Sequence, residues 1–123
     1  MVLRSWRYSM TNPDFWKKLD ELISSCNIVI DRPKGTHHPR YPECVYEVDY
    51  GYLEGTSSMD GDGIDLYLGS LPEKKLDGII VIVDMVKKDS EIKLLLGVSQ
   101  SELNWIMEWC NGTELMKGIY ISR

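Results

Sequence analysis

The stretch that decides the fold covers residues 79–98 and reads IIVIVDMVKKDSEIKLLLGV. Its two halves, 79–86 and 92–98, are rich in β-branched and aliphatic side chains, and the segment 87–90 between them is polar. Such apolar runs are typical of strands, and a short polar segment that joins two of them is typical of a hairpin turn. The stretch therefore predicts a β-hairpin built from the two strongest strands of the chain.

Two helices are predicted, one near the beginning of the chain and one after the hairpin. The first follows Asn12, which suits an N-cap, and its apolar residues recur at helical spacing until about Ser25. The second follows the hairpin, is capped by Ser99 or Ser101, and ends at residues 111–112. Both helices have one apolar face, so we expect them to pack against a sheet.

Four further strands are predicted at 27–31, 45–52, 64–69 and 116–121. Consecutive short strands joined by short turns favour a mostly antiparallel sheet or a small barrel over a doubly wound parallel sheet. The expected fold class is therefore α+β and predominantly β. A chain of 123 residues suits a single domain spanning residues 1–123.

Composition excludes several classes of function. The net charge of −5 argues against a general nucleic-acid binder, which needs a basic face. The longest apolar run, residues 79–83, is too short to span a bilayer, and residues 1–8 carry charges where a signal peptide needs an apolar run. Three widely spaced cysteines are typical of free thiols in a reducing compartment. We therefore expect a cytoplasmic protein with no membrane partner.

The turn before the third strand concentrates negative charge. Asp60, Asp62 and Asp65 fall within six residues, and Gly61 and Gly63 allow the backbone to turn sharply between them. Carboxylates this close repel one another unless a cation compensates them, and their hard oxygens suit Mg²⁺, Mn²⁺ or Ca²⁺. The spacing excludes an EF-hand loop, but a solvated acidic turn is an alternative interpretation.

The residues around this turn resemble the signature region of the soluble family I inorganic pyrophosphatases. The run 49–66, DYGYLEGTSSMDGDGIDL, is similar to that family's Tyr-Gly-Tyr segment followed by an Asp-x-Asp-Pro-x-Asp turn. Upstream, residues 28–35 resemble the family's early strand, in which an acidic residue precedes a proline. Downstream, residues 78–97 resemble its hairpin, which ends in an acidic residue, a spacer and a lysine. The resemblance implies a small, mostly antiparallel, OB-like β-barrel of five to six strands flanked by two helices.

The resemblance also implies a metal-dependent activity, the hydrolysis of inorganic pyrophosphate to two phosphates by a metal-bound water. By position it implies metal-binding roles for Asp31, Asp60, Asp65 and Glu91. The expected cofactor is Mg²⁺, with Mn²⁺ as an alternative. Asp62 matches the carboxylate that takes a proton from the water. The partner implied is pyrophosphate or a related small phosphoanhydride.

Four further residues are implied to hold phosphate. Tyr50 and Lys93 match phosphate-contacting groups of the family. Arg40 and Lys34 are candidates to replace a lysine and an arginine that the family carries on a hairpin missing from this chain. The family's C-terminal Tyr-Lys pair is missing as well. These losses leave open a catalytically degenerate metal- and phosphate-binding module, and an interaction domain with an idle acidic turn.

The family commonly forms oligomers, so a homo-oligomer is possible. We expect the four tryptophans to be core residues or oligomer contacts: Trp6, Trp16, Trp105 and Trp109.

Overall fold

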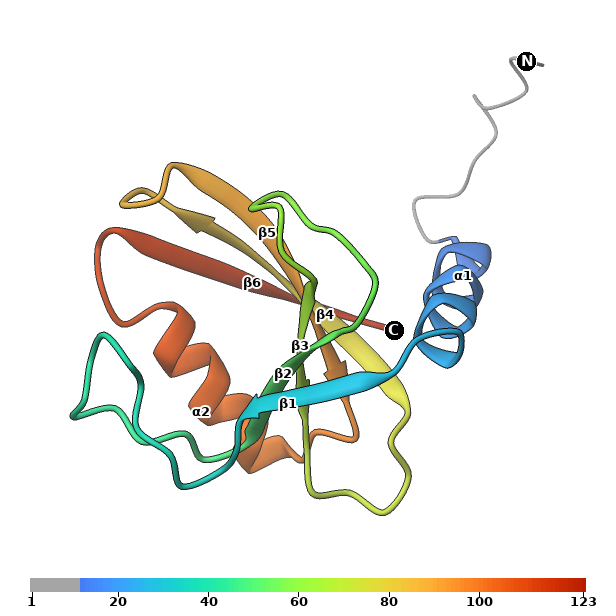
Figure 1. Cartoon of the computed structure of the whole chain (residues 1–123), viewed down its shortest axis with the longest axis horizontal. Helices are drawn as coiled ribbons and strands as arrows, with labels where there is room; N and C mark the ends of the chain where they lie inside the picture. The colour runs from blue at the N-terminus through green and yellow to red at the C-terminus, as the bar shows by residue number, and fades with distance from the viewer. Residues whose placement is uncertain (1–11) are drawn as a thin grey trace.

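The computed structural model describes residues 12–123, which form two helices and six strands (Figure 1). The helices are α1 (Pro13–Ser24) and α2 (Gln100–Cys110). The strands are β1 (Ile28–Arg32), β2 (Asp49–Leu53), β3 (Ile64–Leu68), β4 (Leu76–Asp84), β5 (Asp89–Leu96) and β6 (Met116–Ser122). This arrangement confirms the α+β, predominantly β class. Trp6, expected in the core or at an oligomer contact, lies outside the described residues.

All six strands belong to one sheet, in the order β1-β2-β3-β5-β4-β6. Neighbouring strands are antiparallel except for β3 and β5, which are parallel. Within residues 12–123, β1 and β6 form the two edges and do not pair with each other. The sheet is therefore mixed and open, and it does not close into the barrel that the family resemblance implied.

The hairpin predicted from residues 79–98 is confirmed as β4 and β5, which pair over eight positions. Its turn is held by Asp84, whose Oδ1 accepts the backbone N–H groups of Val86 and Lys87 at 2.9 and 3.1 Å. The strand β5 begins at Asp89, before the start at residue 92 that the apolar run predicted. Asp89 and Ser90, the second half of the polar segment 87–90, therefore belong to β5.

The two faces of the sheet carry separate cores, because neighbouring side chains along a strand point to opposite faces. On one face Ile80, Ile82 and Leu95 pack with α2, and on the other Ile79 and Leu94 pack in the cluster that includes α1. In Figure 1 the two helices lie at different sides of the sheet. Trp105 and Trp109 pack against the first core and Trp16 against the second.

Both helices begin as predicted. Asn12 Oδ1 accepts the N–H of Asp14 at 2.9 Å at the start of α1. At the start of α2, Ser99 rather than Ser101 is the N-cap, and it forms a capping box with Glu102. No helix within residues 12–123 has the length and apolar character to cross a membrane.

The strand predicted at 45–52 is wrong at its beginning, because β2 starts at Asp49. The preceding segment instead folds back on the 35–38 loop. The N–H of Tyr46 donates to the carbonyl of Thr36 at 2.9 Å, and the N–H of His38 donates to the carbonyl of Cys44 at 2.9 Å. Backbone hydrogen bonding within the proline-rich loop therefore replaces pairing with the sheet.

An irregularity in β1 determines which side chain faces β2. Ile30 pairs with Gly51, but the next pair joins Arg32 to Tyr50, so Asp31 is the extra residue of a bulge. The strands approach closely here, and a Cβ placed on Gly51 would lie 1.8 Å from the carbonyl oxygen of Val29. The contact is possible because Gly51 has no side chain.

The Gly51→Ala substitution should lower the free energy of unfolding by about 2–3 kcal/mol, because β1 must move away from β2 to admit the methyl group. Urea denaturation followed by tryptophan fluorescence measures the change. Gly112→Ala is the matched control, since its nearest neighbour would be 3.3 Å away. Equal stability of the two variants would contradict the close contact.

Candidate functional site

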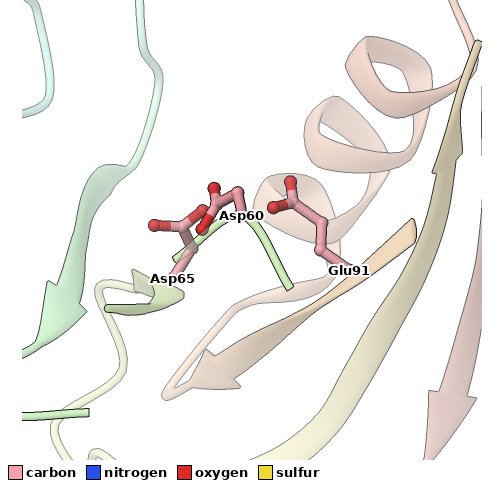
Figure 2. A group of neighbouring side chains, drawn as sticks. All are labelled: Asp60, Asp65 and Glu91. Atoms are coloured by element: carbon pink, nitrogen blue, oxygen red, sulfur yellow. The ribbon is translucent and has the colours of Figure 1, made fainter. Parts of the chain in front are cut away.

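Three carboxylates from distant parts of the sequence converge on the α2 side of the sheet. Asp60 lies in the turn between β2 and β3, Asp65 in β3 and Glu91 in β5. One oxygen of each lies within 4.8 Å of one oxygen of the other two. Figure 2 shows the three side chains pointing toward one another. The parallel pairing of β3 with β5 is what brings Asp65 and Glu91 together.

The turn itself holds Asp60 in its charged form. Asp60 Oδ1 accepts the hydroxyl of Ser58 at 2.6 Å and the backbone N–H of Asp62 at 3.0 Å. The Ser58 hydrogen bond, followed by that of the Asp62 N–H, lowers the pKa of the Asp60 carboxyl. Asp60 is thus an ionised ligand candidate that its neighbours orient.

A lysine ammonium lies against two of these carboxylates. Lys93 Nζ is 2.8 Å from Glu91 Oε1 and 3.1 Å from Asp65 Oδ2. It also donates to the hydroxyl of Tyr50 at 2.6 Å. The side chains of Lys93, Asp65 and Glu91 are 11%, 22% and 9% exposed, so water screens these ion pairs weakly.

Electrostatic interactions keep both the Lys93 ammonium and the Tyr50 hydroxyl protonated. Burial alone would lower the pKa of the Lys93 ammonium, but Tyr67, Asp65 and Glu91 together raise it above the ordinary lysine value. Burial, and then the charges of Asp65 and Glu91, raise the pKa of Tyr50. Lys93 is therefore a fixed cation and Tyr50 a neutral hydroxyl.

One oxygen from each of the three carboxylates is placed to bind a hard divalent cation. The contacts of Lys93 use Asp65 Oδ2 and Glu91 Oε1, and those of the turn use Asp60 Oδ1. The Tyr50 hydroxyl, which accepts a hydrogen from Lys93, is also hydrogen-bonded to the Asp65 carboxylate. Three carboxylate oxygens form a donor set that suits Mg²⁺ or Mn²⁺, and the Lys93 ammonium beside them suits an anion.

Two other predicted acidic residues lie outside this group. Asp62 is exposed on the same turn, where its N–H supports Asp60. Asp31 is exposed at the bulge of β1 and is not among the clustered carboxylates. The catalytic role of Asp62 and the metal-binding role of Asp31 stay predictions.

The two cations expected to replace the family's hairpin residues lie in the loop after β1. Lys34 is exposed, its backbone N–H donates to Asp49 Oδ1 at 2.8 Å, and the residue lines a hollow with Ser70 and Ser99. Arg40 is exposed near His38, whose ring packs against Trp109 of α2 at 5.4 Å between centroids. No ion pair joins either to the carboxylate cluster in residues 12–123.

Arg32, which no sequence motif indicated, also lies beside the site. Its guanidinium carbon lies 5.5 Å from the centroid of the Tyr50 ring, and Nη1 donates to the hydroxyl of Tyr46 at 2.8 Å. Arg32 ends β1 opposite Tyr50 only because of the bulge at Asp31. No sequence pattern predicts this bulge. The one relevant sequence feature is an arginine next to the end of the strand predicted at 27–31.

Comparison with known proteins indicates a distant likeness in fold. No model of a protein family matches the sequence, and no curated protein matches it. Among solved structures, an inorganic phosphatase from Anaplasma phagocytophilum superposes with a TM-score of 0.53 at 14% sequence identity. The match covers 77% of this chain and 81% of that one. The two proteins therefore share a fold over most of their lengths.

Removing the Lys93 ammonium should leave two carboxylates uncompensated. We expect Lys93→Met to lower the free energy of unfolding by about 3–5 kcal/mol in EDTA. Millimolar Mg²⁺ should restore part of this loss, because a divalent cation can then compensate the same carboxylates. Urea denaturation with and without Mg²⁺ measures both effects.

The matched control is Lys75→Met, because the Lys75 side chain is 72% exposed and pairs with Glu73 outside the site. It should leave the free energy of unfolding and its response to Mg²⁺ unchanged. A Lys93→Met variant as stable as the parent protein would show that the ammonium is not needed to compensate the carboxylates.

Proposed function

We propose that this chain hydrolyses inorganic pyrophosphate, or a related small phosphoanhydride, with the help of Mg²⁺ or Mn²⁺. The observation that carries the proposal is the convergence of Asp60, Asp65 and Glu91 beside the ammonium of Lys93. Carboxylates and ammonium together complement a metal–phosphate pair, in which the metal is cationic and the phosphate anionic. The shared fold with a structure named as an inorganic phosphatase is compatible with the proposal.

Hydrolysis breaks the bridging P–O bond and forms a new P–O bond to a water oxygen. Asp60, Asp65 and Glu91 would hold the metal, which supplies charge neutralisation and a more acidic water. Asp62, on the same turn as Asp60, takes the proton released by the attacking water. Its exposed side chain can then return the proton to solvent.

Negative charge develops on the oxygen of the departing phosphate as the bridging P–O bond breaks. Lys93 stabilises that charge, because its ammonium is fixed at the edge of the carboxylate group. Tyr50 orients the ammonium by accepting one of its hydrogens at 2.6 Å. The residues thus divide into those that hold the metal and those that hold the leaving group.

A second function, a non-catalytic metal- or phosphate-binding module, is favoured by one specific contact. Lys93 already pairs with Glu91 at 2.8 Å and with Asp65 at 3.1 Å, so two of the three carboxylates have a counter-ion without a divalent ion. Calorimetry that detects binding of Mg²⁺ and phosphate, combined with no phosphate release, would identify this module.

Purified protein should release phosphate from pyrophosphate in the presence of Mg²⁺ or Mn²⁺ and none in EDTA, because the carboxylates need a metal to tolerate an anionic substrate. A colorimetric phosphate assay across metal concentrations measures the activity. Folded protein that releases no phosphate at any metal concentration would contradict the proposal.

The Asp62→Asn substitution should lower kcat at least about 100-fold, because asparagine cannot accept the proton. The midpoint of thermal unfolding and the affinity for Mn²⁺ should change little, since Asp62 supports Asp60 through its backbone N–H. Asp77→Asn, an exposed carboxylate in β4, is the matched control and should keep full activity. An Asp62→Asn variant with parental kcat would remove Asp62 from the mechanism.

A further inference from the structure

Arg32 is a half-buried cation on the same side of the sheet as the carboxylate group. Its only hydrogen bond to a side chain within residues 12–123 joins Nη1 to the hydroxyl of Tyr46 at 2.8 Å. No carboxylate forms an ion pair with it in that part of the chain. A guanidinium has five N–H donors, so most of the binding capacity of Arg32 is available.

The aromatic rings fix where this guanidinium lies. Its carbon is 5.5 Å from the centroid of the Tyr50 ring and 5.9 Å from that of Tyr46. Lys93 Nζ is 5.0 Å from the same Tyr50 centroid. The ring of Tyr50 therefore contacts two cations, Lys93, which is compensated by carboxylates, and Arg32, which is not.

The bulge in β1 creates this arrangement. In a regular ladder Asp31 would follow Ile30 and stand opposite Tyr50, on the face of the site. Asp31 is instead the extra residue, and Arg32 takes the position opposite Tyr50. The bulge thus replaces a negative charge by a positive one beside the site, which is a known use of bulges near functional sites.

We propose that Arg32 binds the second phosphoryl group of the substrate and so selects diphosphates over single phosphates. This inference rests on the proposed function, because it assigns one end of the substrate to the carboxylate group and Lys93. A diphosphate held there presents its other end toward the uncompensated guanidinium. Orthophosphate or a phosphate monoester bound at the same place leaves Arg32 without a partner.

The guanidinium suits this task better than an ammonium would. Its planar fork can donate two parallel hydrogen bonds to two oxygens of one phosphoryl group. The Tyr46 hydroxyl and the two rings restrict its rotation, so little side-chain freedom is lost on binding.

The test compares the affinities of the full chain for methylenediphosphonate, which cannot be hydrolysed, and for orthophosphate, both with Mg²⁺. Isothermal titration calorimetry should show that Arg32→Gln weakens methylenediphosphonate binding about 10- to 100-fold, the effect of losing a hydrogen bond to a charged group. Orthophosphate binding should be nearly unchanged. Lys75→Gln, an exposed cation outside the site, should alter neither affinity.

Arg32→Lys provides a second variant if Arg32→Gln fails to fold. It keeps the charge but loses the fork, so methylenediphosphonate should bind about tenfold more weakly. A purely structural role for Arg32 predicts a lower midpoint of thermal unfolding with unchanged diphosphate affinity, and that result would overturn the inference.

The outcomes also separate this inference from the proposed hydrolysis. Protein that binds methylenediphosphonate through Arg32 but releases no phosphate from pyrophosphate would sink the hydrolysis and keep the diphosphate site. If the parent protein and the Arg32→Gln variant hydrolyse pyrophosphate equally well and bind methylenediphosphonate with equal affinity, the hydrolysis stands and the role of Arg32 is overturned.

Discussion

A lysine ammonium enclosed by a sheet has to be compensated by nearby charge, and Lys93 meets this constraint through Glu91 at 2.8 Å and Asp65 at 3.1 Å. The hydroxyl of Tyr50 completes its coordination at 2.6 Å. These contacts join β2, β3 and β5 on one face of the sheet. The same contacts orient two carboxylates toward Asp60, so the ion pairs that stabilise the fold also shape the candidate metal site.

The sheet gives its two faces different tasks. One face is filled by aliphatic side chains such as Leu66 and Leu94, and α1 covers part of it. The other face combines the α2 core with the tyrosines and ionisable groups of the site. The bulge at Asp31 adds Arg32 to this second face without disturbing the Ile30 contact on the first. A local irregularity thus changes the charge of the site while the core stays intact.

The sequence predicted the helices and strands better than the way in which the strands pair in the sheet. Helical spacing and caps located both helices, and alternation located six strands with errors of a few residues. The beginning of β2 was missed because residues near Tyr46 bond to the preceding loop. The parallel pairing of β3 with β5 and the open sheet depend on long-range contacts that periodicity does not encode. Of the four metal-binding residues implied by the resemblance, Asp60, Asp65 and Glu91 lie together and Asp31 does not. The position of Arg32 depends on a bulge.

The proposed metal site requires one divalent cation to bind oxygens of Asp60, Asp65 and Glu91 while Lys93 keeps its contacts with two of these carboxylates. Anomalous X-ray diffraction from crystals grown with Mn²⁺ tests it directly, because the metal is then located without reference to activity. We expect an anomalous peak bonded to all three carboxylates, next to the Lys93 ammonium. The absence of a peak there at millimolar Mn²⁺, with Lys93 still paired to Asp65 and Glu91, would contradict it.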